Sequence, residues 1–205
     1  GGAIFFSTTA EGTLSLTDST FTGNTAGREG GSIYITGCKN YSISGSTFAN
    51  NESTFGVRGG GAIYSTASEG TMSNVTFIGN HSHKGGAIAL HSGSKLTVNS
   101  MVAKGNYADA YVSEGNSSIG FGGVFYVNNS TLYLEEKAEG DSIVIGGTED
   151  GEENTAVNGG VIYAESNAVI QMVGAEFIRN SAENGGAIYV ASSSILDAVN
   201  TTFQN

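Results

Sequence analysis

Short segments in which apolar and polar residues alternate recur along the whole chain. Examples are Leu14-Ser15-Leu16, Leu96-Thr97-Val98 and Ile170-Gln171-Met172. Alternation with a period of two residues predicts β-strands with one buried face. We find no segment with the 3.6-residue apolar spacing of an amphipathic helix. The pattern therefore predicts an all-β protein.

A second kind of strand follows a doublet of glycine, and this doublet recurs seven times. Each doublet precedes a small residue and then a large apolar residue, at intervals of 29, 30, 25, 37, 37 and 26 residues. A period in this range indicates one structural unit that is stacked many times. The doublets are Gly1 and Gly2, Gly30 and Gly31, Gly60 and Gly61, Gly85 and Gly86, Gly122 and Gly123, Gly159 and Gly160, and Gly185 and Gly186.

A third kind of strand begins at the motif Phe-x-x-Asn. Asn106 ends a degenerate copy without phenylalanine, and Asn154 closes a unit in which we expect Ile143 and Ile145 to form the corresponding strand. Clear copies join Phe21 to Asn24, Phe48 to Asn51, Phe77 to Asn80 and Phe177 to Asn180.

Three short strands in each repeat, without helices, fit a right-handed parallel β-helix of about seven coils. Residues 1–205 then form a single β-helix segment, and we expect it to be an internal slice of a longer repeat protein. Coils about 4.8 Å apart would make a rod on the order of 30 Å long.

The glycine doublets and the motif asparagines predict two different structural roles at the corners of each coil. A glycine permits unusual backbone angles and lets neighbouring coils approach closely, where a Cβ would obstruct them. An asparagine at the opposite corner can adopt a left-handed conformation and hydrogen-bond to nearby backbone. Stacked on its equivalents, it would form a ladder of amides inside the bend.

The Gly-Gly strand also predicts a row of aromatic rings that point away from the core. Such rings either meet sugar rings or a protein partner, or stack on one another and stabilise the sheet. The rings belong to Phe5, Tyr34, Tyr64, Tyr126, Tyr163 and Tyr189, and Ala89 occupies the same position in the fourth unit.

Three segments are longer than the repeat requires. We expect loop insertions near residues 52–58, 107–120 and 135–153. Insertions at the corners of solenoids commonly carry binding specificity. These segments are therefore the first candidates for a binding surface.

Composition narrows the possible partners. The formal net charge is −11, which disfavours nucleic acid and anionic lipid. No stretch approaches the roughly 20 apolar residues of a membrane-spanning helix. Cys38 is the only cysteine, so a disulfide within the segment is excluded.

Candidate chemistry is sparse, and we predict no catalytic residue, no cofactor and no metal. A glycosidase needs two carboxylates roughly 5 to 10 Å apart, and no acidic pair repeats at one position of adjacent coils. Asp150, Glu152 and Glu153 offer hard oxygen ligands for calcium, but a run of charges more often marks a solvated turn. Three imidazoles, those of His81, His83 and His91, lie close in sequence without a fourth zinc ligand.

The two alternating motifs resemble the repeats of the chlamydial polymorphic outer membrane proteins, most closely from Phe177 to Tyr189. In that family, such repeats form the passenger of an autotransporter, which is displayed at the cell surface and acts as an adhesin. The resemblance implies a non-enzymatic passenger that binds a protein or glycan ligand on another cell or matrix surface. An extracellular structural filament, sheath or appendage is the alternative, in which the partners are neighbouring subunits. A polysaccharide-active enzyme is a third possibility.

Overall fold

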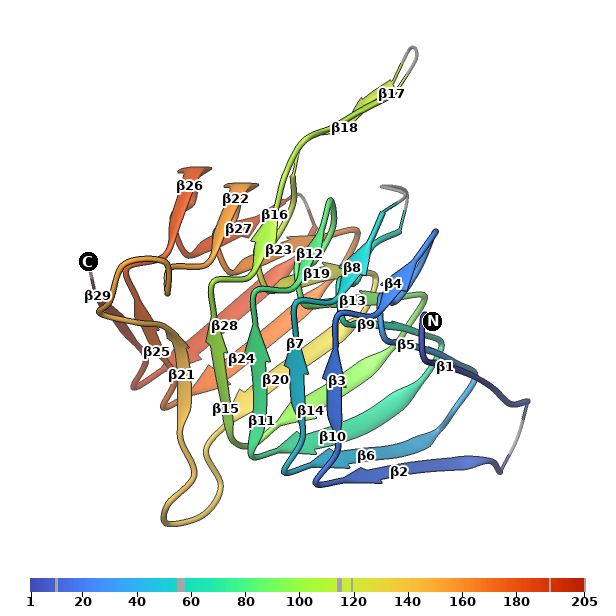
Figure 1. Cartoon of the computed structure of the whole chain (residues 1–205). Helices are drawn as coiled ribbons and strands as arrows, with labels where there is room; N and C mark the ends of the chain where they lie inside the picture. The colour runs from blue at the N-terminus through green and yellow to red at the C-terminus, as the bar shows by residue number, and fades with distance from the viewer. Residues whose placement is uncertain (10, 55–57, 114–115, 119, 192, 205) are drawn as a thin grey trace.

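The computed structural model describes residues 1–9, 11–54, 58–113, 116–118, 120–191 and 193–204. They form a parallel β-solenoid in which equivalent strands of successive coils lie side by side (Figure 1). The predicted all-β parallel β-helix is therefore confirmed. The expected seven coils of three strands need correction, because the solenoid has about six turns with four sheets.

Sheet A collects the strands that follow the glycine doublets, and its strands pair in parallel. They are β1 (Ile4–Ser7), β5 (Ile33–Thr36), β9 (Ile63–Thr66), β13 (Ile88–His91), β19 (Phe125–Asn128), β23 (Ile162–Glu165) and β27 (Ile188–Val190).

Sheet B collects the segments of alternating polarity. Its strands are β2 (Thr13–Thr17), β6 (Asn40–Ser44), β10 (Glu69–Ser73), β14 (Lys95–Val98), β20 (Thr131–Glu135), β24 (Val169–Val173) and β28 (Ile195–Val199).

Sheet C collects the strands that contain the phenylalanines. Its strands are β3 (Thr20–Thr22), β7 (Thr47–Ala49), β11 (Val75–Ile78), β15 (Met101–Lys104), β21 (Ile143–Gly146), β25 (Glu176–Ile178) and β29 (Thr202–Gln204). Strand β21 pairs with β15 and β25, which confirms the strand expected at Ile143 and Ile145.

Sheet D is the fourth sheet, which the sequence pattern did not predict. It follows the motif asparagines directly, and four of its strands are only two residues long, too short for an alternating pattern to be recognised. Its strands are β4 (Thr25–Ala26), β8 (Glu52–Ser53), β12 (His81–Ser82), β16 (Tyr107–Ala108), β22 (Thr155–Asn158) and β26 (Ser181–Asn184).

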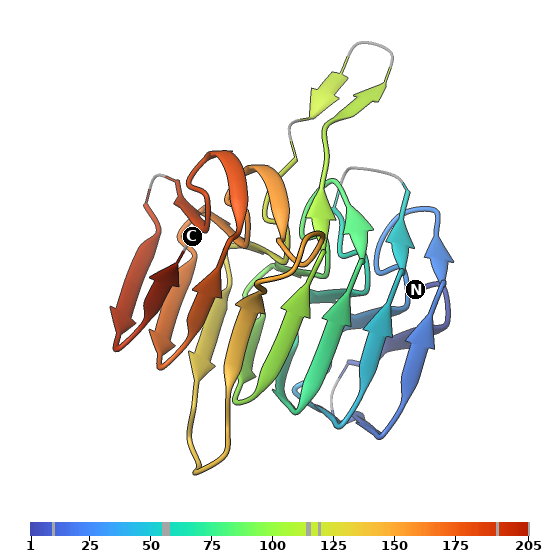
Figure 2. The same cartoon turned by 60° about the vertical axis from the view of Figure 1, so that its left-hand side comes forward.

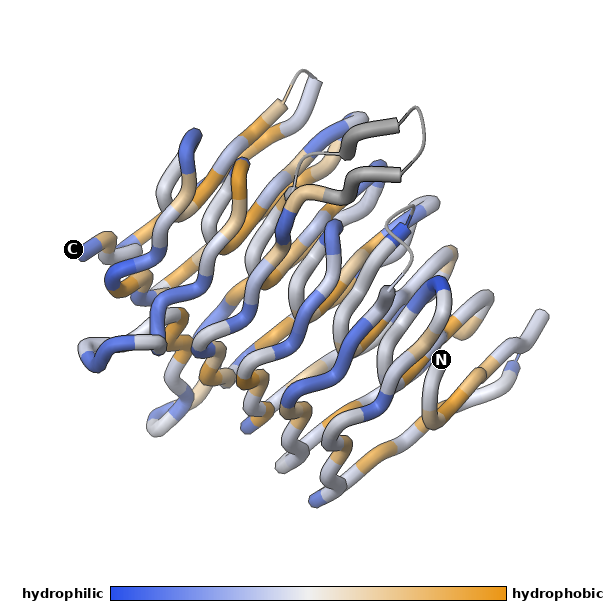
Figure 3. Tube along the Cα trace, turned by 45° about the horizontal axis from the view of Figure 1, so that its top comes forward, coloured by the Kyte–Doolittle hydropathy of each residue, from blue (hydrophilic) through white to orange (hydrophobic). Residues whose placement is uncertain are grey.

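The core runs along the axis of the solenoid, where the inward side chains of sheets A, B and C meet. Equivalent residues stack in register, so that Ile63 pairs with Ile88 and Ile88 with Phe125. Stacked phenylalanines recur in sheet C, with 4.9 Å between the ring centroids of Phe48 and Phe77. Figure 3 shows apolar positions recurring at matching places in successive coils.

The two glycines of each doublet serve different purposes. The first takes a positive φ, as in Gly85 with 65°, and a Cβ there would lie 2.1 Å from the carbonyl oxygen of Ile88. The second allows two coils to touch, because a Cβ on Gly86 would lie 2.2 Å from the carbonyl oxygen of Gly123. Neither contact leaves room for a side chain.

A ladder of serine side chains joins the coils at the corner between sheets A and B. The Ser68 amide donates to the Ser94 hydroxyl at 3.2 Å, and the Ser94 amide donates to the Ser130 hydroxyl at the same distance. The buried thiol of Cys38 lies in the same row and donates to the carbonyl of Gly12. This serine ladder has no recognisable sequence signal, because serine is frequent throughout the chain.

Substituting the inner doublet glycine tests the close contact between coils. We expect Gly86→Ala to lower the free energy of unfolding by about 3 kcal/mol, because backbone must move to admit the methyl group. Gly186→Ala is the matched control, since a Cβ there would meet its nearest atom at 3.4 Å, and it should change stability by less than about 0.5 kcal/mol. Chemical denaturation measures both; equal losses would contradict the interpretation.

Candidate functional site

The motif asparagines form a continuous ladder of amides at the corner between sheets C and D. The side-chain oxygen of Asn80 accepts the backbone N–H of Asn51 at 3.1 Å and its side-chain amide at 2.9 Å. The same pair of bonds joins each ladder asparagine to the next. The ladder consists of Asn24, Asn51, Asn80, Asn106, Asn154 and Asn180.

The second proton of each amide is also used. The Asn80 amide donates to the carbonyl of Phe48 at 2.9 Å, and the Asn106 amide donates to the carbonyl of Phe77 at 3.0 Å. Asn80 and Asn106 are fully buried. A buried amide whose donors and acceptor are all engaged supports the fold and offers nothing to a ligand.

The outward rings of sheet A form a cluster that we call the outer aromatic cluster. It is made of Tyr34, Tyr64, Tyr126, Tyr163 and Tyr189, together with Phe121 and His91. Ala89 interrupts the row between Tyr64 and Tyr126, and the His91 ring fills the space, 5.1 Å from Tyr64 and 5.2 Å from Tyr126.

The middle rings of this cluster are buried, which fits the alternative in which the outward rings stack on one another. Tyr64 and Tyr126 are each 1% exposed, whereas Phe5 in the first coil is 63% exposed. The chain that leads into the glycine doublets folds back over the rings. The Phe121 ring lies 4.4 Å from Tyr163, and the Lys84 ammonium lies 5.0 Å from the centroid of Tyr126. The cluster is thus a second small core, as the stacking alternative implies.

Glu165 closes the outer aromatic cluster at its polar edge. Its carboxylate accepts hydrogen bonds from the hydroxyl of Tyr126 and, at 2.9 Å, from the amide of Asn128. Burial raises the pKa of Tyr163 to about 12, and the nearby Glu165 charge raises it as well. Burial also raises the pKa of Tyr126. These groups therefore stay hydrogen-bonded and un-ionised as phenols near neutral pH.

The 107–120 insertion contains a projection from the solenoid. After β16, the chain forms an antiparallel hairpin of β17 (Tyr111–Ser113) and β18 (Asn116–Ser118). Figure 2 shows this hairpin standing out from the edge formed by sheet D. The 52–58 insertion leaves the same corner after β8, and its residues 55–57 lie outside the described residues.

The 135–153 insertion lies on both sides of β21. Its candidate calcium ligands do not converge, because each engages a different partner. Glu152 pairs with Lys104 at 2.7 Å, and Asp150 pairs with Arg179 at 3.2 Å. The Lys104 hydrogen bond holds the pKa of Glu152 below its usual value. Glu153 accepts the backbone N–H of Gly151.

The three histidines separate into two places. His91 belongs to the outer aromatic cluster, whereas His81 and His83 lie at the sheet D corner beside Asp109. Among the described residues, His81, His83 and Asp109 form the group of histidine and acidic side chains that could hold a metal ion. Asp109 was missed because it lies 26 residues after His83, and only the register of the coils brings the two together.

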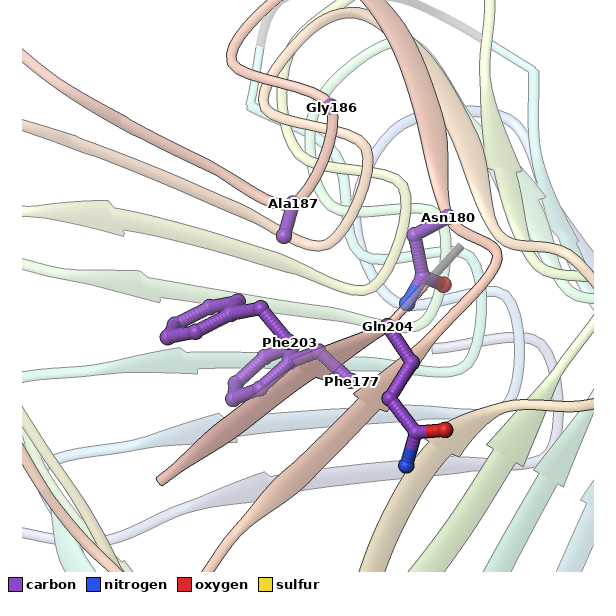
Figure 4. A pocket seen from close by; sticks show the side chains of 6 residues that line it. All are labelled: Phe177, Asn180, Gly186, Ala187, Phe203 and Gln204. Carbon is purple, nitrogen blue, oxygen red and sulfur yellow. The ribbon is translucent and has the colours of Figure 1, made fainter. Parts of the chain in front are cut away.

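A cavity of about 300 Å³ opens in the last coil (Figure 4). The Phe203 and Phe177 rings stack in it with 4.9 Å between centroids, and Asn180 closes one side. In the inner coils, the same positions contact the coil that follows. The cavity is thus lined by residues at positions that form contacts between coils elsewhere in the solenoid.

Comparisons with known proteins identify the repeats. The model of the Chlamydia polymorphic membrane protein repeat matches residues 18–36, 74–90 and 174–191. These three segments therefore match the repeat of the chlamydial polymorphic membrane proteins. No solved structure matches the chain significantly. Across the described ranges, the structure contains no helix with the length and apolarity to cross a membrane.

Two curated proteins are similar in sequence to most of the chain. A probable autotransporter, YfaL of Escherichia coli K12, is 29% identical over 82% of this chain. The probable outer membrane protein pmp6 of Chlamydia pneumoniae is 31% identical over 73% of it. The aligned segments span only 13% and 12% of the relatives' own lengths.

Removing one amide tests the asparagine ladder. We expect Asn80→Ala to lower the free energy of unfolding by about 3 kcal/mol or more, because it leaves two buried donors of Asn51 without an acceptor. Asn24→Ala removes a donor at the first, part-buried member and should cost about 1 kcal/mol. Urea denaturation compares the two variants; similar losses would show that burial and ladder position do not matter.

Protonation of His91 should make stability depend on pH. The pKa of His91 is lowered to about 4, and burial is the largest cause. The charges of Lys84 and Arg58 also lower this pKa, whereas a hydrogen bond to the Arg58 carbonyl and the Glu165 charge raise it. The unfolded chain then binds more protons between about pH 4 and 6.5, so stability is complete above this window and falls as the pH falls through it, by about 2–3 kcal/mol.

The variant His91→Gln isolates this contribution. Its free energy of unfolding should vary less with pH than that of the unmodified chain between about pH 4 and 6.5. Both proteins contain the same carboxylates, so the difference between their profiles belongs to His91. Parallel profiles would contradict the assigned cause.

Proposed function

We propose that this chain is part of a surface-displayed passenger that attaches to other cells or to extracellular ligands without catalysing a reaction. The projecting hairpin β17–β18 is the observation that carries the proposal. It leaves a scaffold in which most other sheet D corners lead to the glycine doublet by short connections. Asn80, Asn154 and Asn180 each precede a doublet by only four intervening residues.

The chemistry of the scaffold supports attachment through projections. The asparagine ladder and the outer aromatic cluster use their polar and aromatic groups internally, so the ligand must meet other residues. Lys104 and Arg179 engage the acidic groups of the 135–153 insertion, which favours a non-catalytic role. The names of the two relatives, an autotransporter and an outer membrane protein, support display at the cell surface. The ligand is a protein or glycan of another cell or of the matrix.

A deletion of residues 110–119 tests the proposal. It leaves five residues between Asn106 and Gly122, the same number that separate Asn24 from Gly30, so the coil closes in a geometry the chain already uses. We expect circular dichroism to show the β-sheet signal of the solenoid, lowered only by the loss of the two short hairpin strands. Beads coated with this variant should lose adhesion to cultured epithelial cells or to immobilised matrix glycoproteins, relative to beads coated with the unmodified chain.

The matched control shortens a different corner. Deleting residues 137–141 together with Glu136→Gly leaves Gly-Ser between β20 and β21, as Gly45 and Ser46 join β6 and β7. This variant should keep its adhesion. Retained binding after loss of the hairpin would place the ligand elsewhere, and absence of binding by the unmodified chain would contradict attachment itself.

A further inference from the structure

The corner between sheets D and A brings together two imidazoles and a carboxylate from neighbouring coils. His81 begins β12, and His83 follows directly after this strand, two residues further along the chain. Strand β12 pairs with β16 so that His81 lies beside Tyr107 and Ser82 beside Ala108. The next step of this register places Asp109 beside His83.

The potential ligand atoms of these three side chains converge. Asp109 Oδ1 lies 2.9 Å from His81 Nε2 and 2.8 Å from His83 Nδ1, and all three ligand atoms lie within 4.8 Å of one another. Atoms bonded to one tetrahedral Zn²⁺ at about 2.1 Å lie about 3.4 Å apart. The Asp109 side chain is 54% exposed, so it can shift by the small amount needed.

A second carboxylate lies behind His81, in the preceding coil. Glu52 Oε1 is 3.3 Å from His81 Nδ1, so it can accept a hydrogen bond from Nδ1–H and leave Nε2, 2.9 Å from Asp109 Oδ1, as the ligand atom when a cation is bound. Metal-binding histidines commonly have such a carboxylate partner, which fixes the tautomer and the ring orientation. The His81 ring also stacks on Tyr107 with 4.3 Å between centroids.

We propose that His81, His83 and Asp109 bind one divalent transition-metal cation, with Zn²⁺ the best match, and that Glu52 orients His81. Two imidazole nitrogens and a carboxylate oxygen form the three-ligand set of zinc sites that keep a position open for water or another ligand. Asp109 lies two residues before β17, so the cation joins the base of the hairpin to the preceding coil. The competing explanation is that Asp109 only hydrogen-bonds both imidazoles, with its carboxylate and, at 3.0 Å from His83 Nδ1, with its backbone carbonyl oxygen.

Titration of the metal-stripped chain with ZnCl₂ in a calorimeter separates the two explanations. We expect one Zn²⁺ per chain, and affinity at least about tenfold weaker in His81→Gln, Asp109→Asn and Glu52→Gln. Asp141→Asn is the matched control, because this exposed carboxylate binds backbone amides of a different corner. It should bind Zn²⁺ as the unmodified chain does, and His91 remains in every variant.

Cobalt gives an independent readout. Co²⁺ bound by the unmodified chain should show visible absorption bands that disappear in His81→Gln. Circular dichroism without metal establishes that the variants are folded. His83→Gln is a less direct test, because the His83 ring is buried and its replacement also disturbs packing. No saturable Zn²⁺ binding by the unmodified chain, or binding unchanged in the three variants, would overturn the proposal and leave the hydrogen-bonded carboxylate as the explanation.

Discussion

The register between coils, held by the asparagine ladder, is the constraint on which the rest of the structure depends. From Asn51 onward, the side-chain oxygen of each ladder asparagine accepts two hydrogen bonds from the ladder asparagine of the preceding coil. One comes from its backbone N–H and one from its side-chain amide. A shift of one residue between coils would break both bonds and turn the inward side chains of the flanking strands outward. The stacking of Phe48 on Phe77 and the contact of Gly86 with Gly123 both require the same register.

This register also decides where the chain can vary. At the glycine doublets the coils lie too close for a Cβ, and at the ladder the amides have no spare donor or acceptor. Extra residues therefore occur at corners, where added loop length costs little conformational entropy. The hairpin β17–β18 and the 135–153 insertion lie between strands whose pairing is preserved on both sides. Variation is thereby confined to loops while the scaffold stays constant.

Sequence patterns predicted what each coil repeats and missed what arises between unlike coils. The strands of sheets A, B and C were predictable because the same residue types recur at the same positions. The burial of Tyr64 was not, because His91 replaces a ring missing at Ala89. The short strands of sheet D lack a recognisable period, and the neighbourhood of His83 and Asp109 depends on coils of unequal length.

The sheet D corner has a chemical character that the other corners lack. Strands β8, β12 and β16 at this corner are only two residues long. Polar side chains within and just after these strands therefore lie close to those of the neighbouring coils. Glu52, His81 and Asp109 come from three successive coils at this corner. The hairpin begins two residues beyond Asp109. The proposed cation would join the base of this hairpin to the preceding coil without altering the core.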